Sequence, residues 1–375
     1  MSSVMGERIK LTIFGESHGP SIGVVIDGLP AGLKLDWDLI EREMKRRAPG
    51  QNPLATHRKE SDAVSVESGL FEGRTTGMAL CARIPNSNQH SKDYSLLKEV
   101  MRPGHGDFPG YVKFHGCNDY RGGGSFSGRL TAPLVFAGAV AKQLLAQIGV
   151  TVGAHIASLA GITDRPFSPL GETPETLTHL GDNYLALLDE SKREPMEQAI
   201  AAARADKDSV GGTIACMAVG VPVGWGEPYF DSVESRLSHA LFSIPAIKGV
   251  AFGDGFALAG MRGSEANDPM VLEGGEVRCL TNHNGGVLGG ISNGMPISFQ
   301  VVVKPTPSIS KPQQTVNVVR QEETTLEVHG RHDPCIVPRA LPVVEAVTGK
   351  ALLGPDYPDL TAWTLLDLYY LSQRG

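Results

Sequence analysis

The stretch from Leu130 to Ile148 places the strongest constraint on how this chain can fold. Its apolar side chains, which include Val135, Val140 and Leu145, recur at helical spacing and leave almost no polar face. A helix that is apolar nearly all round must be covered by other elements on every side. The sequence therefore predicts a central, buried helix around which the rest of the chain is built.

The remaining segments show the patterns of both strands and helices. Arg8–Phe14 alternates and is rich in β-branched residues, and Ile22–Ile26 is continuously apolar, so both are predicted as strands. Asp36 is a preferred N-cap residue for an amphipathic helix that continues through Arg47. The same criteria predict a hairpin, four more helices and two more strands: Val64–Leu70 with Thr76–Ile84, then Pro195–Ala205, Ser232–Phe242, Arg339–Leu353, Leu360–Gln373, Gly211–Val219 and Pro296–Val303.

One short pattern occurs twice. Ser21–Gly32 contains a predicted strand and then Gly-Leu-Pro-Ala-Gly, whereas Ser209–Gly224 contains a strand and then Gly-Val-Pro-Val-Gly, and a helix follows each. Because GxPxG is a common turn, chance can explain the repeat. The alternative is that the two segments mark pseudo-symmetric halves of one domain. No Pro- or Ser-rich linker separates them, so a single domain is expected over residues 1–375.

Composition excludes several classes of function. The net charge of -7 disfavours nucleic acid as the main partner, because duplex binding needs a dominant basic surface. The five cysteines are scattered without CxxC spacing, which argues against a zinc site and fits reduced thiols in a cytosol. The polar N-terminus predicts no signal peptide, and no apolar run approaches the roughly 20 residues that span a bilayer. A cytoplasmic protein without membrane or nucleic-acid partners is expected.

The segment Gly15-Glu16-Ser17-His18-Gly19 matches the GxSxG pattern of the nucleophile elbow in α/β hydrolases. A serine esterase that uses Ser17 is therefore one interpretation. An elbow joins a strand to a helix after several earlier strands, but here only fourteen residues precede the motif and a strand-like segment follows it. A polar hairpin turn with a surface histidine is the second interpretation, since isolated motifs often arise by chance.

The long segment from Asn86 to Gly124 contains many loop-forming residues, and loops of this length in compact domains are usually functional or disordered. Within it, Arg102-Pro103-Gly104-His105 combines a cation, a rigid turn and a titratable imidazole, although a capped loop with a solvated histidine has the same pattern. The glycine-rich run from Arg121 to Arg129 leads into the buried helix. It can form an anion site at the helix N-terminus or a flexible loop, but it lacks the ending of a P-loop.

Basic clusters and a late aspartate complete the candidates. Lys45-Arg46-Arg47 and Arg58-Lys59 are the densest basic segments of an acidic protein. They can form a phosphate pocket or a solvated helix end. Asp333 lies between a histidine and a proline just before a predicted helix, and it is either a functional carboxylate or an N-cap.

Together these segments resemble the chorismate synthase family along nearly the whole chain. The three family signatures resemble Gly15 through Pro30, Gly124 through Ala139 around Ser127-Gly128-Arg129, and Arg331-His332-Asp333-Pro334-Cys335 through Ala346. Shorter matches lie between them in the expected order: Arg102–His105, Asp119–Gly124, Lys248–Val250, Gly253–Phe256, Asn282–His283 and Gly285–Gly286. Many ordered motifs over this length argue against coincidence.

The resemblance implies an α+β fold, namely a β-α-β sandwich with two pseudo-symmetric halves and antiparallel sheets around central helices. The implied activity is a phosphate lyase that converts 5-enolpyruvylshikimate 3-phosphate to chorismate and phosphate by anti-1,4-elimination in the shikimate pathway. Reduced FMN (FMNH2) is the implied cofactor, and a homotetramer is the implied assembly. Since no extra dinucleotide-binding segment is evident, reduced FMN is expected to come from an external flavin reductase.

Residue roles also follow from the resemblance. His18 would protonate the departing phosphate, His105 would stabilise charge on the N1/O2 side of the flavin, and Asp333 would help flavin N5 to act as the base. Three residues match substrate-side positions: Ser17, Arg47 and Arg129. Twelve residues match flavin-contacting positions: Ser125, Phe126, Ser127, Pro245, Ala246, Gly289, Lys304, Pro305, Thr306, Pro307, Ser308 and Arg331.

Three places depart from the family pattern. Pro53 stands where many members have an arginine, Ser125-Phe126 replaces a frequent Arg-Ser pair, and Pro245 stands where asparagine is common. Details of anion and flavin contact are expected to differ there. None of the three departures touches His18, His105 or Asp333.

Overall fold

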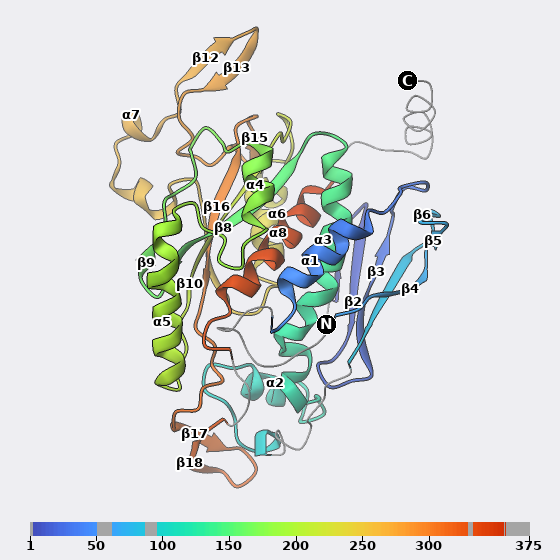
Figure 1. Ribbon diagram of the computed structural model, residues 1–375, viewed down its shortest axis with the longest axis vertical. Coiled ribbons are helices and arrows are strands. Elements are labelled where there is room, and N and C mark those ends of the chain that lie inside the picture. Colours follow the sequence, from blue (N-terminus) through green and yellow to red (C-terminus); the bar gives the residue numbers. More distant parts are fainter. Residues whose placement is uncertain (1–2, 51–61, 87–95, 329–332, 356, 358–375) are drawn as a thin grey trace.

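The computed structural model describes residues 3–50, 62–86, 96–328, 333–355 and 357. At its centre lies helix α3 (Thr131–Ala146), which is the predicted apolar helix and is mostly buried. Its companion is α8 (Val337–Leu352), which has the same length of 16 residues and is buried along nearly all of it. Figure 1 shows both helices between two sheets, which provide the cover that an apolar helix requires. The predicted helix at Leu360–Gln373 lies outside the described residues.

The first sheet contains five antiparallel strands in the order β1-β2-β3-β7-β4. Their bounds are β1 (Val4–Met5), β2 (Lys10–Gly15), β3 (Ser21–Asp27), β7 (Leu80–Pro85) and β4 (Ser65–Ser68). Alternate side chains of the middle strand β3, from Ile22, Val24 and Ile26, are buried, and β3 packs against α3. The period of two thus directs one face of this sheet toward the central helices.

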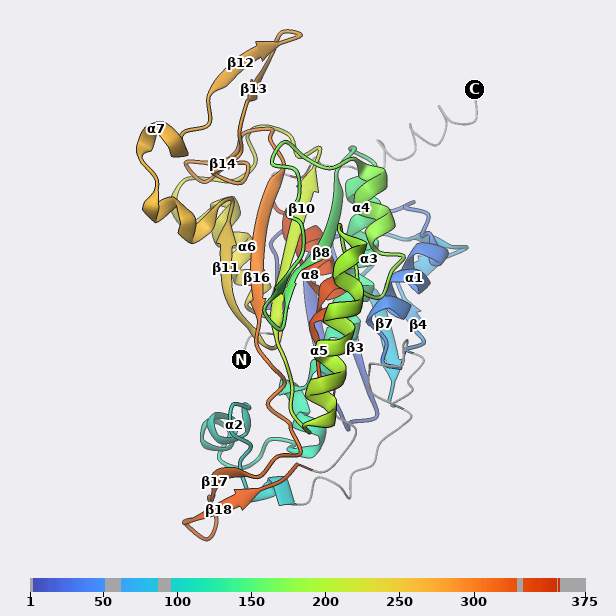
Figure 2. The same cartoon turned by 60° about the vertical axis from the view of Figure 1, so that its left-hand side comes forward.

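The second sheet contains five antiparallel strands in the order β11-β16-β10-β8-β9. Their bounds are β11 (Ile247–Phe252), β16 (Ile297–Val303), β10 (Gly212–Val219), β8 (Thr151–Leu159) and β9 (Ile162–Thr163). Cys216 of β10 faces α8, because its Sγ donates to Thr348 Oγ1 at 3.7 Å. A Cβ at Gly153 of β8 would instead meet Leu177 of α4 (Pro174–Leu180) on the opposite face. Figure 2 shows α4 and α5 (Arg193–Ala205) outside this sheet.

The two sheets repeat one topology. Their strand orders correspond when written as β1-β2-β3-β7-β4 and β9-β8-β10-β16-β11. In each half the third strand leads through a helix, α1 (Trp37–Arg47) or α6 (Val233–Leu241), to the fifth strand and then the fourth, and a 16-residue helix follows. The two GxPxG turns also match, because Gly28, Gly32, Gly220 and Gly224 all have positive φ, between 79° and 98°. The repeated pattern therefore marks two pseudo-symmetric halves.

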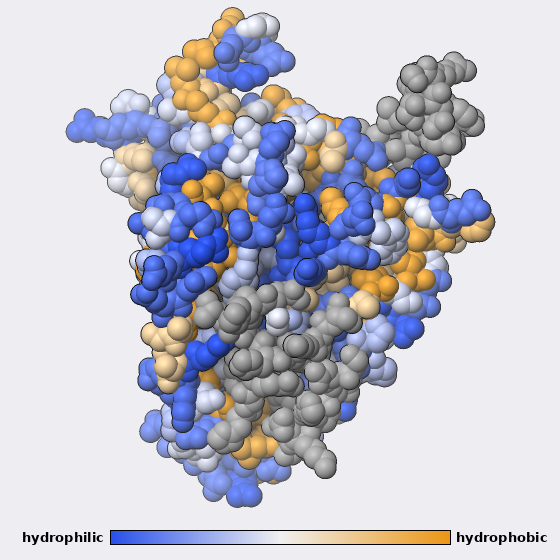
Figure 3. Space-filling view, in the orientation of Figure 1, coloured by the Kyte–Doolittle hydropathy of each residue, from blue (hydrophilic) through white to orange (hydrophobic). Residues whose placement is uncertain are grey.

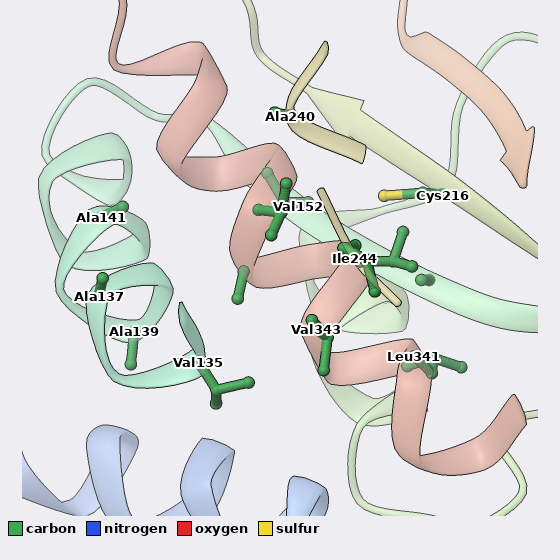
Figure 4. Packing of buried hydrophobic residues seen from close by; sticks show 14 of the residues in the cluster. Val135, Ala137, Ala139, Ala141, Val152, Cys216, Ala240, Ile244, Leu341 and Val343 are labelled. Carbon is green, nitrogen blue, oxygen red and sulfur yellow. The ribbon is translucent and has the colours of Figure 1, made fainter. Parts of the chain in front are cut away.

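The halves meet where α3 packs against α8. Helix α1 packs on α3, and α6 packs on α8. Figure 4 shows α3 and α8 near each other, with the buried Ala137 and Ala141 on α3 and Val343 on α8. A Cβ on Gly138 would lie 2.2 Å from Ala346 Cβ, so the two helix backbones approach very closely here. One apolar cluster extends through both halves.

Smaller elements extend from both ends of this body. The short hairpins are β5–β6 (Leu70–Phe71 and Arg74–Thr75), β12–β13 (Met270–Glu273 and Glu276–Cys279), β14–β15 (Val287–Leu288 and Ile291–Ser292) and β17–β18 (Gln313–Asn317 and Glu322–Leu326). Figures 1 and 2 show β12–β13 projecting with α7 (Gly263–Ala266) at one end. At the other end lie β17–β18 and α2 (Asp107–Lys113).

The predicted elements that lie within the described residues are confirmed, but several observed elements were not predicted, among them β8, α2, α4 and β11. Asp36 caps α1, since its Oδ1 accepts a hydrogen bond from Leu39 N at 3.1 Å. Strand β8 was not predicted; both of its faces are buried, so it lacks the polar–apolar alternation that reveals a strand. Helix α2 lies within the segment that was predicted as loop. Among the described residues no helix has the length and apolar character that crossing a membrane requires.

Candidate active site

A cavity of about 720 Å³ lies where the two halves meet. Each of the four central helices has one of its two ends at this cavity. Arg47 at the end of α1 and Phe242 just after α6 line the cavity, and so do Thr131 at the start of α3 and Ile336 just before α8. Because α1 corresponds to α6 and α3 corresponds to α8, the cavity lies at the pseudo-symmetry axis of the fold.

Helix ends and basic side chains make this cavity electropositive. The N-cap residues of α3 and α8 are Leu130 and Ile336, and neither makes a side-chain capping bond. The start of a helix carries a partial positive charge that stabilises a nearby anion by about 0.3–1 kcal/mol. Six basic side chains line the same cavity: Arg47, Arg102, Arg129, Lys248, Lys304 and Arg339. The cavity therefore suits an anionic ligand.

Arg47 and Arg129 are held together by one buried carboxylate. Arg47 Nη1 donates to Asp62 Oδ2 at 2.7 Å, and Arg129 Nη1 donates to Asp62 Oδ1. Backbone oxygens fix the same side chains, since Arg47 Nη2 donates to Gly128 O at 2.8 Å and Arg129 Nη2 donates to Pro85 O at 3.4 Å. Burial lowers the pKa of Arg47 to about 10, although Asp62 acts in the opposite direction. Both arginines that are predicted to lie on the substrate side are thus fixed at the cavity wall.

The glycine-rich loop passes between the two candidate histidines. Gly122, Gly123 and Gly124 have φ values of 58°, 84° and 53° in the 3₁₀ segment η2 (Arg121–Phe126). A Cβ on Gly122 would lie 2.1 Å from His18 Nδ1, and one on Gly123 would lie 3.2 Å from His105 Nε2. Both the positive φ and the lack of space require glycine. His105 and Gly122 line the cavity, whereas His18 is buried directly behind Gly122.

His105 is held by a buried carboxylate. Its Nδ1 lies 2.6 Å from Asp107 Oδ1. Arg102 donates to the same carboxylate from Nε at 2.7 Å and from Nη2 at 2.8 Å, and its Nη1 donates to Ser308 Oγ at 3.1 Å. Burial alone would raise the pKa of Asp107, but hydrogen bonds from Arg102 and His105 hold that pKa well below its usual range. Asp107 is therefore an ionised carboxylate in contact with the His105 imidazole.

Asp333 lies at the cavity beside Arg339. Arg339 Nη1 donates to Asp333 Oδ2, and Arg339 Nε donates to the backbone oxygen of Arg47 at 3.1 Å, so α8 and α1 are joined at the site. The alternative prediction that Asp333 caps α8 is wrong. The N-cap position is Ile336, and the Asp333 carboxylate is bound to an arginine one turn into the helix instead.

The predicted flavin-side residues fall into three groups. Nine of them line the cavity: Ser125, Phe126, Ser127, Pro245, Ala246, Lys304, Thr306, Pro307 and Ser308. Pro305 and Gly289 do not line it, and Arg331 lies outside the described residues, as do Pro53, Arg58 and Lys59. The residue after Gly289 accepts a bond from Val233 N at the start of α6, whereas the cavity lies at the end of that helix.

Lys304 joins the two halves across the cavity. It follows β16 of the second half, and its Nζ donates to Gly104 O in the loop that carries His105. Burial and the neighbouring Lys248 lower the pKa of Lys304. The Thr306 Oγ1 close by is buried and has no hydrogen-bond partner among the described residues. An anionic ligand with acceptor oxygens can satisfy both groups.

Sequence reasoning missed several residues of this site. Arg102 and Lys248 lie within motifs that the sequence singled out, and Arg339 lies six residues after Asp333, so their positions carried a signal. Asp62 carried no sequence signal, because it is 15 residues from Arg47 and 67 residues from Arg129, the two arginines that it binds. Only the fold brings these charges together.

Ser17 does not have the surroundings of a nucleophile elbow. It lies in the turn between the antiparallel strands β2 and β3, and no helix follows. Its Oγ is buried and has no hydrogen-bond partner among the described residues. The hydrolase interpretation is wrong, and so is that of a surface histidine, because His18 is only 4% exposed.

The fold and the site define the class of protein: an α+β sandwich with a cationic candidate active-site cavity at the junction of two like halves. The chain belongs to the chorismate synthase family, whose family model matches residues 9–354.

Similar proteins agree with this assignment. The chain is 45% identical to a chorismate synthase of Dehalococcoides mccartyi over 93% of this chain and 94% of the relative. It is 46% identical to that of Porphyromonas gingivalis over 100% of this chain and 97% of the relative. A crystal structure of a chorismate synthase matches with a TM-score of 0.74 and 26% identity, and covers 98% of this chain and 99% of the other.

Proposed function

We propose that the chain converts 5-enolpyruvylshikimate 3-phosphate to chorismate and phosphate by anti-1,4-elimination, with reduced FMN as the required cofactor. The observation that carries the proposal is the cationic cavity, where Arg47, Arg129, His105 and Asp333 meet although they come from distant parts of the chain. A departing phosphate gains negative charge, and fixed cations in a partly dry site stabilise that charge more than water does.

The residues present fit a flavin mononucleotide together with a substrate. A volume of about 720 Å³ falls within the range of ligand pockets. Apolar groups for a planar ring come from Phe126, Phe242 and Pro245, while Lys304 and Thr306 offer donors for phosphate or ring oxygens. When bound, reduced FMN supplies transient electron donation and a hydrogen acceptor at N5.

The protein itself supplies charge and protons. Arg47 and Arg129 bind the anionic substrate. Ser17, whose side chain lies behind the glycine loop, is the third substrate-side residue. His18 protonates the leaving phosphate, which lowers the barrier to C–O cleavage. His105 stabilises negative charge on the cofactor, and Asp333 assists removal of the C6 hydrogen with its carboxylate oriented by Arg339.

An anaerobic assay of phosphate release, with and without reduced FMN, tests this function. We expect release only when both 5-enolpyruvylshikimate 3-phosphate and reduced FMN are present, and chorismate should appear in equal amount by its absorbance. Phosphate release that ignores the flavin would contradict the proposal.

Histidine variants test the proposed roles. His18→Ala and His105→Ala should each slow turnover by about 10²–10⁴-fold, the usual effect of losing acid–base assistance. His179→Ala is the matched control, because that side chain is 78% exposed and pairs with Asp182 at the surface. Wild-type rates in both site variants would refute the role assignments.

We further propose that the chain assembles as a homotetramer. The projecting β12–β13 hairpin exposes apolar side chains, including Met270, Leu272 and Val277, and Figure 3 shows apolar surface there. Exposed apolar surface of this kind marks association sites. Light scattering should give four copies of the 39.9-kDa chain, about 160 kDa. Leu272→Glu should lower this mass, whereas Phe71→Ser, at an exposed residue of another hairpin, should not.

Reduced FMN is proposed to come from an external flavin reductase in the cytoplasm. The five cysteines are all unpaired, which fits a reducing compartment. Turnover with NADPH and oxidised FMN should require an added reductase. Turnover by the purified chain alone under these conditions would show that it reduces flavin itself.

A further inference from the structure

The imidazole of His105 has two ring nitrogens in very different surroundings. Nδ1 lies 2.6 Å from Asp107 Oδ1, and the side chains of His105 and Asp107 are only 13% and 8% exposed. The Nε2 edge instead faces the glycine loop, since both Cε1 and Nε2 would lie 3.2 Å from a Cβ on Gly123. His105 lines the cavity from this position.

The short distance decides where the first proton of the imidazole resides. At 2.6 Å, an unprotonated Nδ1 would place its lone pair against those of a carboxylate oxygen, so Nδ1 must carry hydrogen and donate it. Arg102 Nη2 also lies 3.1 Å from Nδ1, and one of its two hydrogens goes to Asp107 Oδ1 at 2.8 Å. The contact between Nδ1 and the carboxylate is the shorter of the two contacts at Nδ1, so the carboxylate decides which proton Nδ1 carries. Nε2 is therefore the nitrogen whose protonation state is left for chemistry.

The carboxylate cannot easily turn away from this role. Arg102 donates to it from Nε, from Nη2 and from its backbone N–H, the last at 3.1 Å to Oδ2. Arg102 is in turn anchored to Ser308 of the other half. Both Asp107 oxygens are thus fixed before any ligand arrives, and Oδ1 is presented to the histidine.

We propose that Asp107 is a positioning residue, which holds His105 in the Nδ1–H tautomer and so directs Nε2 toward the bound cofactor and substrate. The inference rests on the proposed function for its kinetic consequence, but the tautomer itself can be observed without turnover. A carboxylate behind a catalytic imidazole fixes the tautomer and stabilises the imidazolium, and its amide replacement can cost several orders of magnitude in rate.

Nitrogen-15 NMR of histidine-labelled protein tests the tautomer directly. In the wild type, the neutral imidazole of His105 should carry its hydrogen on Nδ1 and not on Nε2. In Asp107→Asn the Nδ1–H form should lose its preference, and an Nε2–H population should appear at alkaline pH. Asp182→Asn is the matched control, because Asp182 lies 3.0 Å from the Nδ1 of the exposed His179 and contacts no site residue.

Kinetics test the consequence separately. Asp107→Asn should lower kcat by about 10²–10⁴-fold with a much smaller change in KM, and the Asp107→Asn/His105→Ala double variant should be no slower than His105→Ala alone. Asp182→Asn should keep wild-type turnover. Multiplicative losses in the double variant would show that Asp107 acts independently of His105.

The outcomes separate the possible failures. A wild-type His105 with bare Nδ1 and protonated Nε2 would overturn the positioning role, and this reading requires no variant to fold. A chain with the expected tautomer but no flavin-dependent phosphate release would overturn the proposed function and leave the assignment of Asp107 standing.

Discussion

The contact between α3 and α8 makes a sharp prediction about Gly138. Alanine is the better helix former, and replacing a helix-interior glycine by alanine usually stabilises a protein by up to about 1 kcal/mol. At Gly138 the added Cβ would lie 2.2 Å from Ala346 Cβ and 2.3 Å from Ala346 Cα. We expect Gly138→Ala to destabilise the fold in spite of its higher helix propensity.

The magnitude follows from which atoms must move. Carbon atoms in contact normally lie about 3.5–4.0 Å apart, so the helices must separate by roughly 1.3 Å. The obstacle is backbone and a side chain with no freedom to turn, and overpacking costs about 1–3 kcal/mol. With the upper value and the propensity gain of about 1 kcal/mol, the net loss is about 2 kcal/mol, or roughly 30-fold in the folding equilibrium.

Urea denaturation followed by circular dichroism measures this loss. Gly349→Ala is the matched control, because Gly349 is also a helical glycine at the α3–α8 contact, and its Cβ would meet Leu145, Lys142 and Ala141 at 3.7–4.0 Å. This is ordinary van der Waals distance, so the control should be as stable as the wild type or up to about 1 kcal/mol more stable.

A second measurement connects the same contact to the site. Separating α3 from α8 by about 1 Å moves Arg129 relative to Asp333 and Arg339, which line one cavity from opposite halves. Misplacement of this size can cost about 100-fold in turnover. The reasoning is refuted if Gly138→Ala is as stable as Gly349→Ala, because the backbones would then not be in contact there.

Three other predictions concern buried charge and the glycine loop. Asp62→Asn leaves two buried arginines without their counter-charge, so the free energy of unfolding should fall by about 3–5 kcal/mol in urea, whereas Glu67→Gln at an exposed ion pair should change it by less than about 1 kcal/mol. Burial lowers the pKa of Lys350 from 10.5 to about 8, so its charged form costs folding about 3 kcal/mol below pH 8, and this cost disappears as the pH rises through 10.5. Lys350→Met should therefore be more stable than the wild type at pH 7 and equal to it near pH 11, and a constant gain would contradict the assignment. Gly123→Ala forces a φ of 84° on alanine and brings a methyl group 3.2 Å from the His105 ring, so kcat should fall tenfold or more while circular dichroism stays unchanged.

Much of the fold was predictable because local signals agreed with the final packing. The apolar helix at Leu130–Ile148, the Asp36 cap and the twin GxPxG turns all identified elements correctly. Strand β8 was not predicted because both of its faces are buried, which removes the alternation of polar and apolar side chains that marks a strand. The family resemblance and the repeated GxPxG pattern together predicted two halves. The equivalence of the two strand orders depends on how the strands pair, which no single segment reveals.

The site was predictable where residues lie within motifs and not where charges pair across the fold. His105, Asp333, Arg47 and most of the predicted flavin-side residues do converge on one cavity. Asp62 belongs to no motif, and its importance follows only from the two guanidinium groups that it bridges. Polar partners of this kind satisfy buried groups, and burial is not a local property of sequence.

Because α3 packs against α8, the order of synthesis limits when the protein can fold in the cell. Synthesis of α3 is complete at Ala146, but its partner α8 is complete only at Leu352. At a synthesis rate of roughly 5–20 residues per second, the apolar face of α3 that packs on α8 stays uncovered for about 10–40 s. A nascent chain arrested before α8 should therefore bind chaperones through α3, and no partial chain can form the cavity. The enzyme acquires its active site only when the last of its central helices emerges.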